Sequence, residues 1–475
     1  MTPALFDGHQ AWTAEALAQE VTAHAARLRA QGTRVLATVL DNGAGFVVLD
    51  EAAAAAGVVH VPLPPFFTPA QMQHALQAAG ADTLVVAAET AASAAALLPP
   101  SMAWAPCAVA GQALQQLRLP ARPVTLPPGT AKITFTSGTT GAPKGVCLSS
   151  AALQRVAASL VQALAPLHIT RHLSALPYAV LLENIAGLMA PRLQGATVLA
   201  LPLRQLGLQG SSSFDAAMFD AAVRAHQPHS LILLPQMLRA WVAHLQAQGL
   251  RAPAGLKLVA VGGAAVGAPL VQAAWALGLP VAEGYGLSEG GSVQTLNLPP
   301  CEAGAGSVGR ALPHAQLRLA DDGEVLVAGA LFSGYLGDPT PVPEWWPSGD
   351  LGRFDAEGRL HIHGRKKHVL ITGYGRNLSP EWVETALKGH PAVLQAVVFG
   401  DGAPALSAVL WPTQPALADA QLQQAVDAAN AALPDYARVA RWVRGRAPFD
   451  TRSGLATANG RPQRAAILTA HRDAL

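Results

Sequence analysis

One stretch narrows the interpretation of this sequence more than any other: residues 136–145 read TSGTTGAPKG. It holds four hydroxyl side chains, three glycines and a lysine. Glycines let backbone N–H groups approach phosphate oxygens, hydroxyls add donors, and lysine adds positive charge. The spacing differs from the G-x-x-x-x-G-K-[ST] nucleotide loop, because Gly138 and Gly141 are three apart and Gly145 follows Lys144. We interpret the stretch as a loop that wraps a polyphosphate, in preference to a plain glycine–serine turn.

The segments before this loop alternate between helix and strand signals. Thr13 is a candidate cap for a helix that ends at Gly32, and Thr68 precedes a proline and a glutamine that suit a capping box. Short apolar runs between such helices read as strands. These runs are Val35 to Leu40, Val58 to Val61, Thr83 to Ala87 and Lys132 to Thr136. The alternation predicts an α/β fold with mostly parallel sheets covered by helices.

Length and composition indicate a large globular protein. The chain has 475 residues, of which 51% are hydrophobic and 13% charged, so a disordered chain, an acidic tail and a coiled coil are excluded. The apolar window from Leu258 to Val271 is interrupted by glycines and a proline, and it is shorter than the roughly 20 residues of a membrane-spanning helix. At this length we expect more than one lobe.

Charge and cysteine usage limit the partners and the location. The chain has 32 basic and 30 acidic residues, and its longest basic run is residues 365–367, so we do not expect nucleic acid as a partner. The cysteines Cys107, Cys147 and Cys301 are far apart and show no disulfide or zinc spacing. The first residues carry no secretory signal. We expect a cytoplasmic protein.

Five blocks of the sequence resemble the signatures of the adenylate-forming superfamily, which contains acyl-CoA synthetases, adenylation domains of peptide synthetases and luciferases. They occur in the family's order and comprise Ser137 to Gly145, Gly284 to Glu289, Ser348 to Gly352, Gly358 with Gly364-Arg365, and Gly373 to Glu384. The resemblance covers nearly the whole chain, with a shortened N-terminal portion. It implies a large N-terminal lobe at residues 1–365 and a small, mobile α+β C-terminal lobe at residues 366–475.

The resemblance implies that a carboxylic acid is joined to AMP from ATP, with release of pyrophosphate. The carboxylate and the α-phosphate are both anions, so cations must offset their charge as they meet. Glu289 matches the family's magnesium ligand, and oxygen ligation suits that ion. The residues implied to hold the phosphates are Thr136, Ser137, Gly138, Thr139, Thr140, Gly141 and Lys144.

Further matches imply the nucleoside site. Tyr285, within the Gly284 to Glu289 block, is expected to stack on adenine. Asp350 matches the residue that accepts hydrogen bonds from the ribose hydroxyls, and Arg365 matches a nearby arginine that contacts the nucleotide. The opposing wall is expected at Gly262, Gly263 and Ala264, and Gly284, Gly286 and Ser288 complete the block, with Ser288 standing where threonine is commoner.

Lys367 occupies the family's hinge position. In this family the small lobe rotates between one pose that makes acyl-AMP and another that admits a thiol, and hinge residues absorb that backbone change. The family's pantetheine tunnel is matched by Gly373, Tyr374 and Gly375. The implied acceptor is coenzyme A or the phosphopantetheine of a carrier protein.

The sequence departs from the family at its C-terminal catalytic block. Where the family has a lysine that neutralises both reacting anions, residues 457–464 read TANGRPQR, and Arg461 takes the lysine's place. Arginine keeps the charge, but its planar fork is bulkier, so the exchange is not conservative. Three outcomes stay open: Arg461 performs the task, adenylation is slow, or the enzyme chiefly forms thioesters from acyl-AMP that is supplied to it. We favour the first.

The predicted acid pocket is the second departure. Residues 176–184 resemble the family's pocket-wall block, and the pocket residues implied are Tyr178, Val180, Leu181 and Leu182. Many members have a histidine or other aromatic residue near Val180 or Leu182, and these positions are aliphatic here. The block has no aspartate for an α-ammonium group, which would be costly to bury unpaired. We therefore expect an apolar, fatty-acid-like substrate and disfavour an amino acid.

Two rival interpretations remain. One changes the acceptor, so that the acyl group loads a carrier protein or an amine. The other belongs to a different class: a nucleotide-binding regulatory or scaffold protein that lost adenylation with the lysine that Arg461 replaces.

Overall fold

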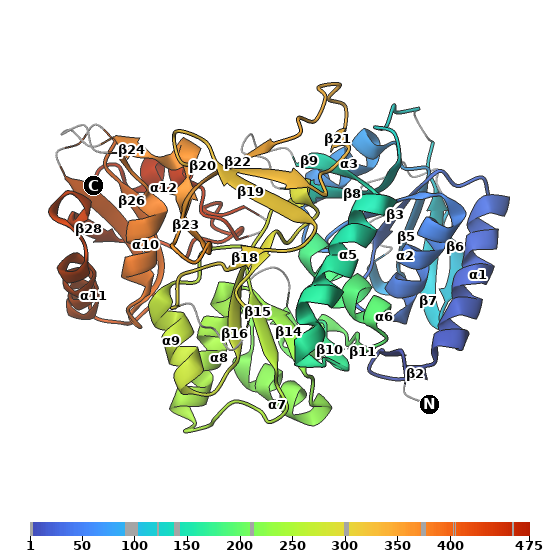
Figure 1. Ribbon diagram of the computed structural model, residues 1–475, viewed down its shortest axis with the longest axis horizontal. Coiled ribbons are helices and arrows are strands. Elements are labelled where there is room, and N and C mark those ends of the chain that lie inside the picture. Colours follow the sequence, from blue (N-terminus) through green and yellow to red (C-terminus); the bar gives the residue numbers. More distant parts are fainter. Residues whose placement is uncertain are drawn as a thin grey trace.

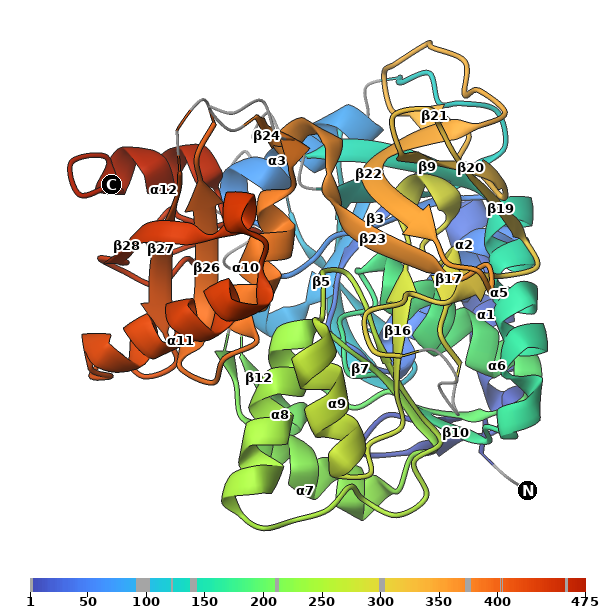
Figure 2. The same ribbon diagram turned by 60° about the vertical axis from the view of Figure 1, so that its left-hand side comes forward.

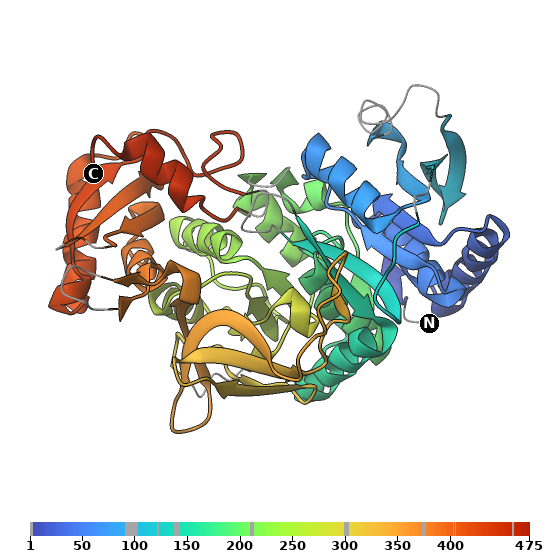
Figure 3. The ribbon, with the colours of Figure 1, turned by 90° about the horizontal axis from the view of Figure 1, so that it is seen from above.

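The computed structural model describes residues 3–90, 103–120, 123–136, 143–209, 213–298, 304–371, 377–401, 403, 405–457 and 460–475. Seen from above, the chain forms an arc with its N-terminal and C-terminal elements at opposite ends (Figure 3). Two large sheets and a four-stranded sheet build a large lobe, and a small α+β lobe follows them (Figure 1). This architecture confirms the predicted α/β fold class.

The first large sheet has eight strands in the order β21-β9-β8-β4-β3-β5-β7-β6. The inner pairs β3·β4, β3·β5 and β4·β8 are parallel, and the outer pairs are antiparallel. The strands are β3 (Val35–Val39), β4 (Val59–Pro62), β5 (Thr83–Ala87), β6 (Ala105–Val109), β7 (Gln112–Arg118), β8 (Thr130–Thr136), β9 (Lys144–Ser149) and β21 (Gly334–Tyr335).

The helices beside this sheet begin and end at the residues that the sequence indicates. The Thr13 side chain caps α1 (Ala14–Ala30), and Thr68 forms a complete capping box at the start of α3 (Pro69–Ala79). Helix α2 (Ala44–Ala56) ends at Gly57, whose φ of 71° is the left-handed conformation that favours glycine. The caps at Thr13 and Thr68 confirm the two predicted helix starts, while α1 ends at Ala30, two residues before the predicted Gly32.

The second large sheet has nine strands in the order β18-β17-β16-β15-β14-β10-β11-β1-β2. Its strands from β16 to β1 are parallel. The strands are β1 (Leu5–Phe6), β2 (Ala11–Trp12), β10 (Arg171–Leu173), β11 (Thr197–Leu199), β14 (Ser230–Leu233), β15 (Leu258–Val261), β16 (Val281–Tyr285), β17 (Thr295–Leu296) and β18 (Arg310–Ala311).

Helices and short elements accompany the second sheet. A π-helix at Glu183–Met189 continues into α6 (Ala190–Gln194) and packs against α5 (Ser150–Leu164). The remaining elements are α7 (Ala216–His226), α8 (Pro235–Ala247), α9 (Ala268–Ala276) and the ribbon of β12 (Leu208–Gln209) and β13 (Ser213–Phe214). Since β16 is followed at once by antiparallel β17, the sheet turns there from parallel to antiparallel pairing.

The last parts of the chain are a four-stranded antiparallel sheet and the small lobe. The sheet comprises β19 (Ala315–Leu319), β20 (Glu324–Gly329), β22 (Trp346–Phe354) and β23 (Leu360–Arg365). The small lobe comprises β24 (Leu370–Ile371), β25 (Asn377–Leu378), α10 (Pro380–Lys388), β26 (Val393–Phe399), β27 (Leu406–Pro412), α11 (Asp419–Ala432), β28 (Val439–Arg444) and α12 (Arg464–His471). It lies beside α8 and α9 (Figure 2), where Arg239 of α8 donates to the backbone oxygen of Lys388 at 2.6 Å.

A buried polar cluster joins the first sheet to the π-helix. The ammonium of Lys132 on β8 lies 2.8 Å from the Asp50 carboxylate of α2, which also pairs with His60 of β4, and Lys132 bonds to Asn184 of the π-helix. All four side chains are buried. Lys132 and His60 hold the pKa of Asp50 below its ordinary value, although burial opposes them. The cluster therefore fixes the π-helix, which walls the cavity described next, to the first sheet.

The helices of the described ranges were compared with the length and apolarity that a bilayer requires. None of them is long and apolar enough to cross a membrane.

Candidate active site

A cavity of about 1110 Å³ lies where both large sheets, the four-stranded sheet and the small lobe meet. It reaches the carboxyl ends of β15 and β16, the usual place for ligands in open α/β sheets. Its lining brings together most of the residues predicted for the site, from segments hundreds of residues apart. These are Thr136, Lys144, Val180, Leu181, Leu182, Gly262, Gly263, Gly284, Tyr285, Gly286, Ser288, Glu289, Arg365, Lys367 and Arg461.

Other predicted residues lie elsewhere. Ser137, Gly138, Thr139, Thr140 and Gly141 of the phosphate loop and Gly373, Tyr374 and Gly375 of the predicted tunnel lie outside the described residues. Of the described residues, Tyr178, Ala264 and Asp350 are not part of the lining.

The phosphate side of the cavity is built on a β-hairpin. Thr136 at the end of β8 is paired with Lys144 at the start of β9, so the predicted phosphate loop spans these two strands. The Lys144 side chain is exposed, and its ammonium lies 5.1 Å from the ring centroid of Tyr335. Because an ammonium over an aromatic face is attracted to the ring's π electrons, Tyr335 holds the charge at the cavity.

The predicted nucleoside residues form one hydrogen-bonded chain. The hydroxyl of Tyr285 donates to Asp350 at 2.8 Å, and the guanidinium of Arg365 lies 2.7 Å from the other Asp350 oxygen. Asp350 and Arg365 face each other across β22 and β23. Burial raises the pKa of Asp350, and Arg365 and Tyr285 oppose that rise. The Asp350 carboxylate thus lies behind Tyr285 and Arg365, which do line the cavity. Its contacts fix the orientation of both side chains toward the cavity.

Glycines make the wall beside Tyr285 thin. A Cβ added at Gly286 would lie 1.5 Å from the backbone oxygen of Ser292, so no other residue fits there without moving the backbone. Gly262, Gly263 and Gly284 lie in the same wall. A wall of bare backbone can accept a flat group at close range.

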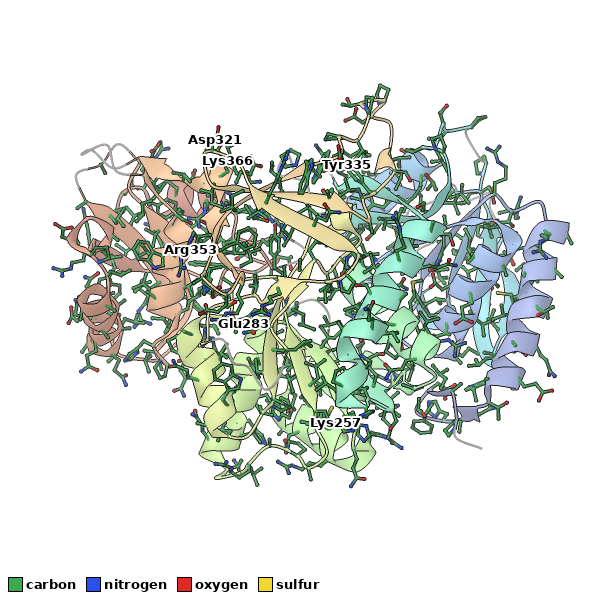
Figure 4. All side chains as sticks on the ribbon, in the orientation of Figure 1. Lys257, Glu283, Asp321, Tyr335, Arg353 and Lys366 are labelled. Atoms are coloured by element: carbon green, nitrogen blue, oxygen red, sulfur yellow. The ribbon has the colours of Figure 1, made fainter. Side chains whose placement is uncertain are left out.

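Glu289 is held by a tyrosine that the sequence did not single out. The Tyr335 hydroxyl donates to Glu289 Oε1 at 2.6 Å, and the Tyr335 ring packs edge-on against Phe332 and Trp346, with centroids 5.0 and 5.9 Å away. Burial, and then Glu289, raise the pKa of Tyr335, so it remains a donor. Figure 4 labels Tyr335 between the four-stranded sheet and the first sheet. Nothing in its sequence context distinguishes it, because the contact joins residues 46 apart.

The basic triplet at residues 365–367 divides its charges among different partners. Arg365 pairs with Asp350, whereas the ammonium of Lys366 lies 2.6 Å from Asp322 and 2.8 Å from Glu324. Lys367 lies in a short 3-10 helix between β23 and β24 and lines the cavity. Removal of water, and then Arg365 and Arg461, lower the pKa of Lys367. The connection between the two lobes is therefore itself part of the cavity wall.

Arg461 reaches the cavity from the small lobe. It ends a tight turn in which Thr457 N–H bonds to the Arg461 oxygen at 2.8 Å, and Gly460 adopts a φ of 73°. Removal of water from its guanidinium, and then the charge of Arg365, lower the pKa of Arg461, although Asp350 and Glu289 favour the charged form. An arginine keeps its proton at any physiological pH. The cavity therefore has a fixed positive charge where the small lobe borders it.

The predicted acid pocket is apolar where expected. Val180, Leu181 and Leu182 line it together with Leu160 and Ile232.

Tyr178 belongs to a different environment. The residue is 1% exposed, its hydroxyl shares a hydrogen bond of 2.8 Å with the Ser174 hydroxyl, and its ring centroid lies 5.2 Å from that of Phe46. The Asn42 side chain accepts a hydrogen bond from the Tyr178 backbone N–H and so orients this segment. Its side chain thus packs into the core instead of the cavity.

Comparisons with known proteins agree with this geometry. The family model described as AMP-binding enzyme matches residues 1–336, and that described as AMP-binding enzyme C-terminal domain matches residues 367–475. The long-chain-fatty-acid–CoA ligase FadD15 of Mycobacterium bovis is 41% identical over 158 residues, which are 31% of this chain and 26% of that protein. The match thus spans about a quarter of that ligase's length.

Two further relatives cover more of the chain. Feruloyl-CoA synthase of Amycolatopsis sp. is 29% identical over 419 residues, 83% of this chain and 81% of that protein. The solved structure of the amide bond synthetase McbA from Marinactinospora thermotolerans superposes with a TM-score of 0.78 at 25% identity, over 98% of this chain and 96% of that chain.

Proposed function

The chain belongs to the AMP-binding enzyme family, and from that premise we propose that it activates an apolar carboxylic acid with ATP to give acyl-AMP and pyrophosphate. The acyl group then passes to a thiol. The proposal covers both half-reactions of an acid–thiol ligase.

One observation carries the proposal: Lys144, Glu289 and Arg461 border the same cavity as an apolar arm. Adenylation brings a carboxylate and an α-phosphate into contact, and both are negatively charged. Fixed positive charges aimed at that point stabilise the transition state, because they need no reorganisation as the reaction proceeds. We assign this task to Lys144 at the β8–β9 hairpin and to Arg461 on the small lobe, because Arg365, which also lines the cavity, is paired with Asp350. Arg461 therefore takes the role of the family's lysine.

Glu289 would hold magnesium together with oxygens of the triphosphate. Within the described ranges no three histidine, cysteine, aspartate or glutamate side chains form a metal-binding group. That fits magnesium, which is commonly held through one or two carboxylates and substrate phosphates. When bound, the ion neutralises phosphate charge. Tyr335 orients Glu289 through its 2.6 Å hydrogen bond.

The nucleoside half of ATP is assigned to the wall made by Tyr285 and the glycines. Tyr285 would lie against the base and Arg365 would contact the ribose, while Asp350, behind them, holds both side chains in place. The phosphate-loop residues 137–141 and a tunnel at residues 373–375 complete the proposal from the sequence resemblance.

The acid arm supports an apolar substrate. It runs between the second sheet and the layer of α5 and the π-helix, where Leu160, Leu164, Ile169 and Leu182 line it. Burying such surface against a hydrocarbon is favourable by about 25 cal/mol per Å². The names of these relatives give a long-chain fatty acid for one and a feruloyl group for the other, so a carboxylic acid joined to coenzyme A is what the names share.

The acceptor is proposed to be coenzyme A. Likeness to the amide bond synthetase McbA supports an amine as the alternative acceptor. A carrier-protein phosphopantetheine is a third candidate. We also propose that residues 366–475 rotate about Lys367 between the two half-reactions, and that the protein is cytoplasmic, which its buried free thiols Cys107 and Cys147 support.

The test is a trapping assay. The purified chain is incubated with Mg-ATP, hydroxylamine and a panel of apolar acids, and acyl-AMP is read as hydroxamate. Coenzyme A, a carrier protein or an amine is then added to identify the acceptor. Hydroxamate with none of the acids, together with tight ATP binding, would instead support a nucleotide-binding scaffold.

Variants of Arg461 test the mechanism. Arg461→Ala is expected to lower hydroxamate formation by about 100- to 1000-fold, the effect of removing one preorganised transition-state donor. Arg461→Lys is expected to retain most of the activity. Arg452→Ala removes an exposed arginine from the same connection and is the control. Unchanged adenylation in Arg461→Ala would remove Arg461 from the mechanism.

A further inference from the structure

The acid arm ends at polar side chains. His172 and Ser230 line the cavity on neighbouring strands, where they are directly paired across β10 and β14. Ser230 is the first residue of β14, and Leu234, just past the strand, lies beside Gly263, where its side chain would be 3.3 Å from an added Cβ, in the wall proposed for the nucleoside. Four residues of strand span about 13 Å at about 3.3 Å per residue. His172 and Ser230 therefore face the part of the substrate farthest from the reacting carboxylate.

A third buried residue holds these two in place. His172 Nδ1 lies 2.8 Å from Ser230 Oγ, and His172 Nε2 lies 3.4 Å from Glu183 Oε1 at the start of the π-helix. Exposure is 3% for His172 and Ser230 and 0% for Glu183. A Cβ at Gly187, one turn along the π-helix, would lie 2.1 Å from Glu183 Oε1 and 2.9 Å from His172 Nε2. The fold thus keeps a glycine where the imidazole and the carboxylate meet.

This polar chain has hydrogen-bonding capacity left. Among the described residues, Glu183 Oε2 is buried and has no hydrogen-bond partner. A serine hydroxyl has one donor and two acceptor positions, and within the described part of the chain the Ser230 hydroxyl makes one hydrogen bond, to His172. Whichever of the two donates, Ser230 retains a free position at the cavity.

The side chains around the Ser230 hydroxyl are apolar, so its free hydrogen-bonding position bears on the identity of the substrate. On the same face of the sheet, Ile232, Leu258 and Ala260 line the cavity, and Leu182 and Ala186 line it from the π-helix. An alkyl chain that reached this end would displace water from Ser230 and His172, and it could not replace the hydrogen bonds that the water makes to them. Leaving a buried polar group unsatisfied costs about 1–3 kcal/mol. An aliphatic side chain at both positions would have avoided that cost.

We propose that the acid carries a neutral hydrogen-bonding group, a hydroxyl or a carbonyl, at its far end, and that Ser230 and His172 bind it. The inference rests on the proposed function for the identity of the arm as the acid site. Glu183 acts through His172, so it is a positioning residue. The substrate class is then a carboxylic acid with an apolar middle and a polar end, bound about 13 Å along β14 from the wall proposed for the nucleoside.

Matched pairs of acids test this proposal. Straight-chain acids from octanoate to dodecanoate, each with and without an ω-hydroxyl, are titrated into the full chain by calorimetry, and each is also assayed for hydroxamate. One hydrogen bond is worth about 1–1.5 kcal/mol, so the best hydroxy acid is expected to bind about 10-fold more tightly than its plain counterpart. The kcat/KM for the hydroxy acid is expected to exceed that for the plain acid by the same factor.

Variants separate recognition from structure. Ser230→Ala and His172→Phe are expected to lose the preference for the hydroxy acid and to change binding of the plain acid far less. Ile232→Val, two residues along the same face, is the control and is expected to affect both acids alike. Circular dichroism checks that each variant folds. If His172→Phe does not fold, Ser230→Ala, which removes only one oxygen, still tests the proposal.

The outcomes distinguish the two proposals. Equal binding of both members of every pair, no binding of any acid, or an equal loss for both acids in Ser230→Ala would overturn the inference. A binding preference without any hydroxamate would refute the proposed function and would leave the polar end of the arm as a binding site.

Discussion

Glu283 offers a test of the site's electrostatics through stability. It lies on β16 next to Gly284 and Tyr285, is 5% exposed and accepts from the Gly306 N–H at 2.8 Å (Figure 4). Burial raises the pKa of Glu283 from 4.5 to about 7. The difference of about 2.5 pKa units corresponds to about 3 kcal/mol at 1.36 kcal/mol per unit.

The sign follows from which state binds the proton. Below pH 4.5 the carboxyl is neutral in both the folded and the unfolded chain, so it costs nothing. Between pH 4.5 and about 7 the unfolded chain releases the proton first, and the free energy of unfolding falls as the pH rises. Above about pH 7 the full cost is present. Glu283→Gln removes the ionisation and keeps an oxygen for Gly306, so it is expected to stabilise the protein at pH 8 by up to about 3 kcal/mol.

Urea denaturation at intervals from pH 4.5 to 8, followed by tryptophan fluorescence, measures this difference. The gain in Glu283→Gln is expected to vanish at the acidic end and to reach its maximum at the alkaline end. The control is Glu344→Gln. Because the Glu344 side chain is exposed, this exchange is expected to leave the free energy of unfolding nearly unchanged across the pH range. A variant that is equally or less stable than the parent at pH 8 would refute the reasoning.

Three further expectations follow from the described contacts. Lys132→Met removes the ammonium that offsets the buried charge of Asp50 and leaves that carboxylate with His60 alone as an ionisable partner, so it is expected to lower the free energy of unfolding by about 3 kcal/mol. Lys257→Met at the surface removes a bond to the backbone of His168 and is expected to change it far less; urea denaturation compares the two variants. Tyr335→Phe keeps the packed ring but removes the hydroxyl from Glu289, so the Mg²⁺ concentration for half-maximal pyrophosphate release is expected to rise about 10-fold, and an unchanged value would contradict that role. Lys367→Pro restricts the proposed hinge and is expected to spare hydroxamate formation while lowering thioester formation at least about 10-fold relative to Lys367→Ala; equal loss of both products would argue against a hinge.

Local signals in the sequence were sufficient for several helix starts and strands, and they singled out many of the residues that line the cavity. A cap at Thr68 and a left-handed glycine at Gly57 act within one turn of helix, so the residues themselves determine where the helix begins or ends. The glycine-rich block around Tyr285 is local in the same way, because its glycines are required by backbone contacts close in sequence, as Gly286 is by Ser292.

Long-range contacts were beyond such reasoning. Tyr335 meets Glu289, and His172 meets Ser230, across 46 and 58 residues. Neither pair has a spacing that a helix or hairpin would produce. The direction of Tyr178 was equally hidden, since Asn42, 136 residues earlier, orients its backbone. Strand pairing and packing between distant segments decide these cases.

The small lobe has an interior of its own, because its two hydrophobic clusters draw only on residues from Leu370 onward. A chain with two separate cores contains two cooperative units, so heating is expected to produce two calorimetric transitions instead of one. A ligand that contacts Arg461 and Tyr285 together would bind only while both units are intact. By mass action such a ligand would raise both melting temperatures and bring the two transitions closer together. The difference between the two melting temperatures would therefore report how much of the protein has ligand bound.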